Sequence, residues 1–285
     1  MTIGWYPGHM NKARKDITKA IKSVDAVMEI VDARLPAASA NPLLAAIIGS
    51  TPCLRVLNKA DLADPLITAH WMQYFQQHGI RAVALDKSRT ARIRDLGNLC
   101  QREFRKPGKH LFRLMIVGIP NVGKSTLLNI LLDRKIARVG NEPAVTKASQ
   151  EYKLSDQVIL VDTPGMLWPK IEDQDAAYRL AASGAIKNTA IEFEDIALFS
   201  VNFLREHYPA LLQARYQLST LPEHSPDILA AIAHRCGCLR KGGVDYVKVA
   251  EILIKDLRAG KIGPVSFEKP LLIQKTTAQV NETQA

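Results

Sequence analysis

The sequence predicts an α/β domain with a mostly parallel, six-stranded sheet, followed by a small all-helical domain. From about residue 24, short apolar runs alternate with longer helix-like segments that Gly, Pro or Asp separate. After about residue 175 the strand pattern stops and only helical patterns follow. We therefore expect the first domain over residues 1–175, a helical domain over 176–265 and a flexible polar tail over 266–285.

The strand candidates are short apolar runs bounded by turn-forming residues, at 24–31, 53–57, 80–85, 111–117, 150–154 and 158–161. Apolar residues at helical spacing predict helices of the first domain at 65–77, 93–104 and 124–132. The same criterion predicts helices of the second domain at 176–187, 193–207, 209–218, 226–235 and 244–257. Strands that alternate with helices are typical of βαβ units, in which helices cover a parallel sheet.

Charge and composition narrow the class of protein. The 285 residues include 38 Lys plus Arg against 28 Asp plus Glu, a net charge of +10. No apolar run approaches the roughly 18 residues of a membrane-spanning helix, and the first residues lack the apolar core of a signal peptide. The four cysteines fit neither a zinc site nor a disulfide framework. We expect a cytosolic protein with an anionic partner, nucleic acid first, with nucleotide phosphates or an anionic membrane surface as alternatives.

A glycine-rich motif, G-x-x-x-x-G-K-S, lies between an apolar strand and a helix start. Its backbone N–H groups can bind phosphates, Lys124 can reach the β- and γ-oxygens, and the Ser125 hydroxyl can bind Mg²⁺. Lys124 is therefore also a catalytic candidate. The alternative is a glycine-rich tight turn with an exposed lysine. The phosphate-binding candidates are Asn121, Val122, Gly123, Lys124, Ser125 and Thr126.

Three more candidates belong to the same region. Asp162 ends a strand and can hold a Mg²⁺-bound water, and the Gly165 N–H can bind the γ-phosphate. Thr146, in the preceding loop, can complete the Mg²⁺ shell with Ser125 and Asp162 when GTP is bound, which would make this loop a switch. The alternatives are a simple Asp-Thr-Pro-Gly turn and a solvated threonine.

Asn58-Lys59-Ala60-Asp61 follows a strand and has the chemistry to read guanine. The Asp61 carboxylate can accept from guanine N1–H and from the exocyclic amine, a donor pair that adenine lacks. The Asn58 amide can bond the O6/N7 edge, and the Lys59 stem can lie over the ring. Asp61 could instead cap the following helix. Together with the phosphate loop, the motif predicts a GTP site with Mg²⁺.

The order of the motifs is unusual, because the base-reading residues 58–61 precede the phosphate loop at 118–125. Moving the last three strands of a six-stranded GTPase sheet to the front places both motifs correctly. The sequence therefore predicts a circularly permuted P-loop GTPase domain, with the basic connector around Pro107 joining the former ends. The segment after Gly165 then leads directly into the helical domain.

The motifs resemble those of the circularly permuted, ribosome-associated GTPases. The resemblance covers the α/β part and rests on residues 5–13, 32–36, 58–61, 118–125 and 162–165. It implies GTP hydrolysis coupled to late assembly of the large ribosomal subunit, release after hydrolysis, and contact of the helical domain with ribosomal RNA. DNA is not an expected partner.

Two segments depart from the pattern of this family. The loop before Thr146 reads Pro-Ala-Val-Thr where Pro-Gly-x-Thr is usual. The second base-contacting motif reads Ala-Leu-Asp-Lys where a Ser-Ala-Lys-like run is usual, and it assigns Asp86 and Lys87 to the nucleotide.

The group that orients the attacking water is not the usual one. Many GTPases place a glutamine after Asp-x-x-Gly, but this chain has Met166, which cannot orient water by hydrogen bonding. His9 is our catalytic candidate, as the resemblance also implies, and its alternative is an exposed residue of a docking or folding element. Asn121 could coordinate K⁺, or it could be a solvated loop amide.

Basic residues form three clusters, which predict contacts with RNA phosphates, although a solvated helix face is the alternative for each. They are Lys12, Arg14, Lys15, Lys19 and Lys22; Arg102, Arg105, Lys106, Lys109 and Arg113; and His234, Arg235, Arg240, Lys241 and Lys248. The alternative function is a guanine-nucleotide-gated RNA-binding switch with little catalysis of its own.

Overall fold

A computed structural model of the chain describes residues 8–134, 149–186 and 192–270. The described residues form two compact units. The first contains residues 8–169 together with 268–270, and the second contains residues 170–267.

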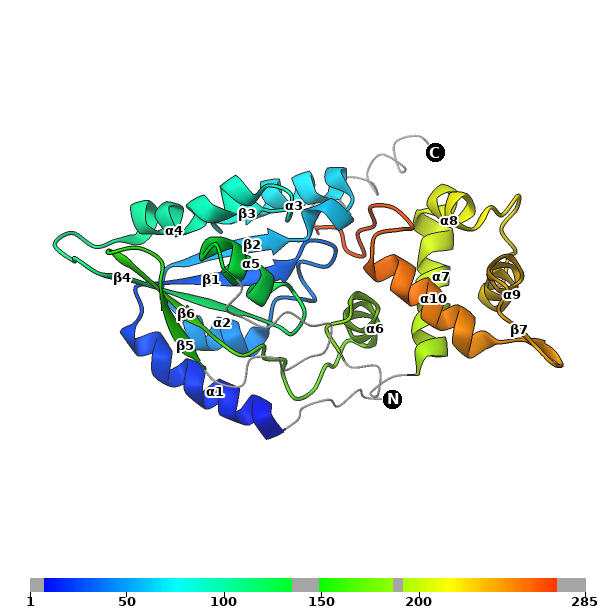
Figure 1. The fold of residues 1–285 in the computed structure, drawn as a ribbon, viewed down its shortest axis with the longest axis horizontal. Coiled ribbons are helices and arrows are strands. Elements are labelled where there is room, and N and C mark those ends of the chain that lie inside the picture. The colour runs from blue at the N-terminus through cyan, green and yellow to red at the C-terminus, as the bar shows by residue number, and fades with distance from the viewer. Residues whose placement is uncertain (1–7, 135–148, 187–191, 271–285) are drawn as a thin grey trace, which may run out of the picture. The chain divides into compact units, whose positions relative to one another are not determined.

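The first unit is built on a six-stranded sheet in the order β3-β2-β1-β4-β6-β5 (Figure 1). All neighbouring strands are parallel except β5 and β6, which are antiparallel. The predicted mostly parallel sheet of six strands is confirmed. The strands are β1 (Ala26–Asp32), β2 (Cys53–Asn58), β3 (Ala82–Ala84), β4 (Phe112–Gly118), β5 (Gln150–Lys153) and β6 (Val158–Asp162).

Helices cover the sheet because its central strands are apolar on both faces. The helices are α1 (Gly8–Ala20), α2 (Pro42–Ile48), α3 (Pro65–Gln77), α4 (Thr90–Phe104) and α5 (Lys124–Leu131), and short 3₁₀ turns span Ile21–Ser23 and Ala60–Leu62. Val27 and Val31 of β1, four residues apart, belong to two apolar clusters on the same face. Met28 and Ile30 are fully buried as well, so both faces are covered.

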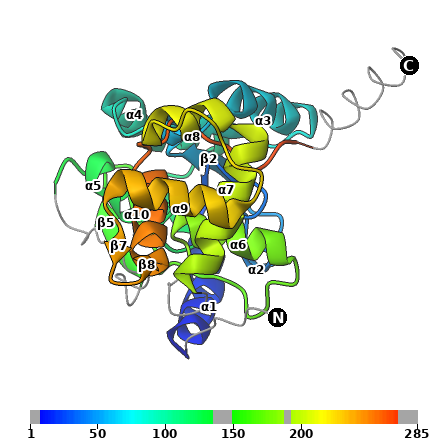
Figure 2. The same ribbon diagram turned by 90° about the vertical axis from the view of Figure 1, so that its right-hand side faces the viewer.

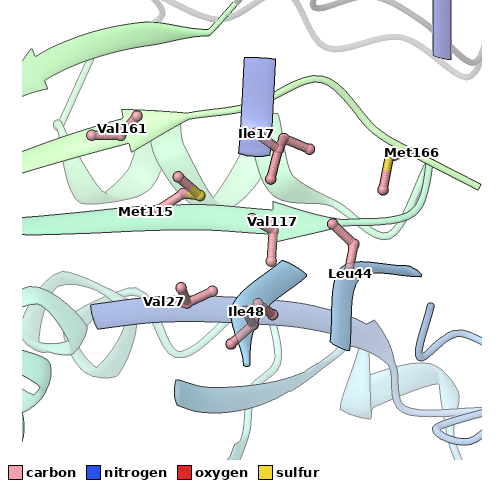
Figure 3. Packing of buried hydrophobic residues seen from close by; sticks show 8 residues of the cluster. All are labelled: Ile17, Val27, Leu44, Ile48, Met115, Val117, Val161 and Met166. Carbon is pink, nitrogen blue, oxygen red and sulfur yellow. The ribbon is translucent and has the colours of Figure 1, made fainter. Parts of the chain in front are cut away.

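The cluster around Val27 joins the sheet to α1 and α2 (Figure 3). Ile17 of α1 and Leu44 of α2 are both fully buried there. The sequence patterns did not predict either helix. Helix α1 is mostly polar, and among its residues 10–20 it buries Met10, Ala13 and Ile17, at helical spacing. Helix α2 has only seven residues.

The second unit is a bundle in which α7 and α10 contact each other and α9 (Figure 2). Its helices are α6 (Gln174–Ser183), α7 (Phe193–His207), α8 (Pro209–Tyr216), α9 (Ser225–Cys236) and α10 (Tyr246–Arg258). A short hairpin of β7 (Leu239–Arg240) and β8 (Gly243–Val244) joins α9 to α10. Buried Asp256 accepts from the guanidinium of exposed Arg215 at 2.9 and 2.7 Å, so only the carboxylate of this ion pair is buried. No helix among the described residues has the length and apolar character needed to cross a membrane.

The first residues of the expected polar tail are packed instead. Phe267 is buried, and its ring lies 5.0 Å from that of Phe203 in α7. The carboxylate of Glu268, in the first unit, accepts from the backbone N–H groups of Ala37 and Ala38. These contacts fix residues that composition alone assigns to a loose segment. The remainder of that segment, 271–285, lies outside the described residues.

Candidate nucleotide-binding site

The phosphate loop leaves the end of β4 and enters α5 at Lys124. A Cβ atom at Gly118 would lie 2.4 Å from the Ile30 carbonyl oxygen, so the strands approach too closely for any other residue. Gly123 has a φ of 99°, which only glycine adopts readily, and it precedes the first turn of the helix. The loop therefore presents backbone N–H groups at a helix N-terminus, which is a site for anions.

Lys124 is buried against its own loop. Its Nζ donates to the carbonyl oxygens of Gly118 at 3.1 Å and Ile119 at 2.8 Å. Burial lowers the pKa of Lys124 to about 8, although the charge of Asp162 acts in the opposite direction. The lysine thus holds its ammonium group at the loop, as its predicted role requires.

Asp162 ends β6 and is buried, and its Oδ1 has no hydrogen-bond partner among the described residues. Burial raises the pKa of Asp162 to about 6, against the charge of Lys124 and the Thr163 N–H. An acceptor without a partner fits a Mg²⁺-bound water, since Mg²⁺ keeps several waters and takes oxygen ligands. The described residues hold no group of three or more His, Cys, Asp or Glu side chains that could bind a metal ion. Half-buried Ser125, in the first turn of α5, is the second residue that would hold the ion.

Gly165 lies directly against the phosphate loop. A Cβ atom there would be 2.9 Å from Pro120 Cα and 3.0 Å from Lys124 Nζ. The next residue donates its N–H to the Gly118 carbonyl at 3.3 Å. The structure therefore brings the predicted γ-phosphate contact next to the predicted phosphate-binding lysine.

Met166 is fully buried and points into the core with Ile17 and Leu44 (Figure 3). Its carbonyl accepts from Asn41 Nδ2 at 2.6 Å. Asn41 also caps α2, since its side chain accepts from the Leu43 N–H. The sequence reasoning missed this contact, although an Asn directly before Pro42 is a typical helix-cap signal. The start of the segment after Gly165 is thus anchored to the first unit.

The base-reading residues are joined to the phosphate loop through Asn58. Its Nδ2 donates to the Val122 carbonyl at 2.7 Å, and a Cβ on Gly123 would lie 2.2 Å from the same nitrogen. The sequence predicts the Asn58 amide at the guanine edge. One N–H of this amide links the base-reading motif to the phosphate loop instead. The structure brings together two segments that lie about 60 residues apart in the chain.

The rest of the base-reading motif lies beside the end of β3. The Ala60 N–H donates to the Leu85 carbonyl at 2.9 Å, which places residues 58–61 next to Asp86. The Oδ1 of Asp86 accepts from the Ser88 N–H at 2.5 Å, and hydrogen bonds from Ser88 lower the pKa of Asp86. Asp61 is exposed and available to a base.

Comparison with known proteins gives the family. A family model described as "50S ribosome-binding GTPase" matches residues 113–231. Ribosome biogenesis GTPase A of Priestia megaterium is 44% identical, over 95% of this chain and 98% of the relative. The chain belongs to the family of ribosome biogenesis GTPase A. The ribosome biogenesis GTPase A of Thermotoga maritima is 32% identical, over 94% of this chain and 95% of the relative.

Solved structures agree with this assignment. The GDP-bound and GNP-bound structures of YlqF from T. maritima are each 28% identical to this chain, with TM-scores of 0.67. They cover 89% and 91% of this chain, and the chain covers 98% and 99% of them. This GTPase therefore has the circularly permuted fold that the motif order predicts, and it hydrolyses GTP.

Two of the predicted site residues of this GTPase lie wholly or partly outside the described residues. Residue His9 lies in the first turn of α1, but its side chain is outside the described residues, as is all of Thr146. Their roles remain predictions. Lys87 is exposed beside Asp86, and Asn121 and Thr126 are half-buried in the phosphate loop and the helix that follows.

The structure also shows a buried ionic network that the sequence reasoning did not assign to the site. Asp32 and Arg34 form an ion pair, and each is 1% exposed. Lys59 of the base-reading motif also binds the Asp32 carboxylate, at 2.9 Å. In the sequence, residues 32–36 stand out only as a family signature. Two opposite charges at the end of a buried strand are the signal that could have pointed to this network.

Proposed function

We propose that this GTPase is an assembly factor that binds the large ribosomal subunit during late maturation and is released after hydrolysis. The family model's description and the names of the relatives support a ribosomal partner. We also propose that the protein is cytosolic, as the sequence predicts, since its partner would be a ribosomal particle in assembly.

The observation that carries the proposal is a basic surface on the second unit. It lies over the end of α9, the β7–β8 hairpin and the start of α10. All of its basic side chains are exposed, and none forms an ion pair within the described part of the chain. Tyr246 is 39% exposed and Leu239 is 51% exposed in the same segment, so aromatic and apolar groups accompany the charge. We call this the hairpin surface: His234, Arg235, Arg240, Lys241 and Lys248.

The connector cluster differs from the hairpin surface, because carboxylates and carbonyls of the first unit already engage several of its members. Lys109 pairs with buried Asp25, and Arg113 pairs with Glu151. The Arg105 guanidinium donates to the Lys109 carbonyl at 2.7 Å. Engaged cations release fewer counterions on binding RNA, so we assign the RNA contact to the hairpin surface in preference to the connector.

The exposed face of α1 is a second contact in this proposal. Its basic residues are exposed and have no ion pair among the described residues. The opposite face buries Ile17 against Met166, two residues after the Asp-Thr-Pro step. Helix α1 thus connects an RNA-facing surface to the segment that follows the γ-phosphate contact.

In the reaction, bound Mg²⁺ would neutralise charge on the β- and γ-phosphates. Lys124 stabilises the charge that develops on the transferred group, and the Gly165 N–H orients its oxygens. We propose that Ser125, Thr146 and Asp162 hold the metal ion, that His9 orients the water, and that Asn121 holds K⁺. The buried Met166 leaves the orientation of water to another group, which supports the role proposed for His9.

Sedimentation with purified large subunits tests the proposal. The GTP-analogue-bound protein should sediment with the subunits, and the GDP-bound protein should not. The double variant Arg235→Glu/Lys241→Glu should weaken this association at least about tenfold and reduce its salt dependence. A matched control with the same charge change in the connector, Arg102→Glu/Lys106→Glu, should stay near the wild-type affinity.

Turnover separates the assembly factor from a nucleotide-gated RNA-binding switch with little catalysis. Large subunits should raise the rate of GTP hydrolysis in K⁺ buffer. No association in either nucleotide state would refute the ribosomal partner, while association without stimulated hydrolysis would favour the switch.

A further inference from the structure

The end of β1 carries a buried ion pair that has no role in the nucleotide site as described so far. The Oδ1 of Asp32 accepts from Arg34 Nε at 2.9 Å and from the Arg34 N–H at 3.1 Å, and Oδ2 accepts from Arg34 Nη2 at 2.8 Å. A buried ion pair is weak evidence for stability, since a well-packed apolar pair is often as stable. A bidentate pair does fix the orientation of the carboxylate, which suits a positioning role.

The Asp32 carboxylate also binds a residue of the base-reading motif. Lys59 Nζ donates to Asp32 Oδ2 at 2.9 Å. Lys59 has a φ of 60°, a left-handed conformation that side chains other than glycine, Asn and Asp seldom adopt. The ion pair and the left-handed backbone conformation therefore occur at the same residue.

The backbone around Asp32 is fixed as well. Its N–H donates to Ser39 Oγ at 3.0 Å, and that hydroxyl donates to the Leu35 carbonyl at 2.6 Å. The Ala33 N–H donates to the Asn58 carbonyl at 2.8 Å, which joins the end of β1 to the first base-reading residue. The carboxylate thus has a fixed place relative to residues 58–61.

Positive and negative side chains alternate from the Asp32–Arg34 pair to Asp61, the base-reading aspartate. Burial by itself would raise the pKa of Asp32, but the charges and hydrogen bonds of Arg34 and Lys59 outweigh it and hold the pKa well below its usual range. Burial would lower the pKa of Arg34, but Asp32, and more weakly the charge of Asp61, raise it instead. Arg34 therefore lies near enough to Asp61 for the two charges to interact.

We propose that Asp32 is a positioning residue for guanine recognition. It holds Lys59 in the left-handed conformation that presents the lysine stem and the Asp61 carboxylate to the base, and Arg34 orients it for this task. This role rests on the GTP site described above and concerns the choice of base. It is a positioning role, because neither Asp32 nor Arg34 needs to touch the nucleotide.

The test is the ratio of the affinities for GDP and IDP, measured with the full-length protein. IDP lacks the exocyclic amine that Asp61 would read, so this ratio reports the placement of Asp61. Asp32→Asn should lower the affinity for GDP at least about tenfold and reduce the GDP-to-IDP ratio at least about fivefold. The ratio is insensitive to a general loss of stability, which melting temperatures report separately.

Glu29→Gln is the matched control. Glu29 is also a buried carboxylate of β1, and it accepts from Arg55 at 3.0 and 2.7 Å. It lies three residues before Asp32, and its arginine partner is not part of the base-reading motif. The control should lose stability, yet keep the wild-type GDP-to-IDP ratio.

A double-mutant cycle with Lys59→Met locates the effect. If Asp32 acts through Lys59, Asp32→Asn should change the affinity for GDP by less than about threefold in the Lys59→Met background. Should Asp32→Asn not fold, Arg34→Lys takes its place, since it keeps the charge but loses the two-point grip on the carboxylate. That variant should also reduce the GDP-to-IDP ratio, by about two- to threefold.

An unchanged ratio in a folded Asp32→Asn or Arg34→Lys protein would overturn the proposal. Equal changes in the ratio for Asp32→Asn and Glu29→Gln would overturn it too, because the effect would then be a general consequence of removing a buried ion pair.

Discussion

The two ends of the nucleotide site differ in how their polar side chains are satisfied. At the base end, Asp32 accepts from Arg34 and Lys59, and the Asn58 amide donates to the phosphate loop. At the phosphate end, Asp162 Oδ1 has no partner within the described residues, and Lys124 donates to carbonyls of its own loop. The comparison indicates a base end that the protein itself organises, and a phosphate end that leaves an acceptor, Asp162 Oδ1, for a ligand.

The two ends also lie on different connections to the helical unit. From the phosphate end the chain leaves the first unit after Pro169, soon after the anchored Met166. It returns at Glu268, whose carboxylate accepts from the Ala37 and Ala38 N–H groups just beyond the Asp32 network. The preceding residue, Phe267, packs in the helical unit. The sequence predicted the first connection only, and the second one brings the chain back to the base end of the first unit.

The largest expected effect is at the phosphate end, from Lys124→Ala. Loss of the ammonium group removes the charge that would stabilise the transferred phosphoryl group, and kcat should fall by about 100- to 1000-fold. Single-turnover hydrolysis measures this rate, and the melting temperature reports folding. Lys153→Ala, at an exposed lysine of β5, is the control and should keep the wild-type rate. A fall of less than tenfold for Lys124→Ala would contradict the assignment of this lysine.

The next effect is at the base end, from Asp61→Asn. The new amide donates where guanine also donates, so the affinity for GTP should fall about 100-fold, given 1.5–3 kcal/mol for hydrogen bonds to charged groups. The affinity for XTP should rise, because xanthine has a carbonyl at C2. Competition binding with the two nucleotides measures the change.

Asp64→Asn is the control for this variant. The Asp64 side chain caps α3 by accepting from the Leu66 and Ile67 N–H groups. Its substitution should affect stability by at most about 1 kcal/mol and leave the base preference unchanged. An unchanged GTP preference in Asp61→Asn would refute the base-reading assignment.

Patterns that are local in the sequence predicted most of the fold. The limits of α3 and α7 agree with the predicted 65–77 and 193–207, since proline or apolar spacing marks them. All six strands lie where the sequence predicts them, although β5 is mostly polar and exposed. The motifs, which are also local, predicted the order of the site elements and the permutation.

What the sequence could not predict depends on contacts between distant segments. The ion pair of Lys59 with Asp32 spans 27 residues, and the contact of Glu268 with Ala37 spans 231. The basic connector looked free for RNA because the carboxylates that engage it, such as Asp25 and Glu151, come from other strands or loops. Composition shows that these charges exist but cannot show which of them meet.

A third prediction concerns Gly123, where the phosphate end and the base end of the nucleotide site are in contact. A Cβ in Gly123→Ala would lie 2.2 Å from Asn58 Nδ2, at a φ of 99°. Moving Asn58 would break its bond to Val122, so the affinity for GDP should fall at least about tenfold, and stability by about 1–3 kcal/mol. Gly79→Ala is the control, because Gly79 has a φ of 67° but nothing within 4 Å of its added Cβ. Gly79→Ala should show the backbone strain without loss of affinity for GDP. Equal losses of affinity in both variants would contradict a specific role of Gly123 between the two ends of the site.

The smallest expected effect on hydrolysis is from Met166→Gln, which places the usual water-orienting residue after Asp-x-x-Gly. The side chain at 166 is fully buried between α1 and the sheet, so the new amide should lack hydrogen-bond partners there. Burial of an unsatisfied amide destabilises by about 1–3 kcal/mol, which lowers Tm by roughly 2–4 °C per kcal/mol for a domain of this size.

Because the backbone of Met166 is held by Asn41 and by the Gly118 carbonyl, the glutamine cannot turn toward the phosphate without loss of these bonds. Intrinsic hydrolysis should therefore rise less than twofold, and Met166→Leu should keep both stability and rate near wild type. A tenfold gain for the glutamine variant would show that this segment leaves the core during turnover. The anchored start of the segment would then be a movable part of the phosphate end, and His9 would no longer be needed to orient the water.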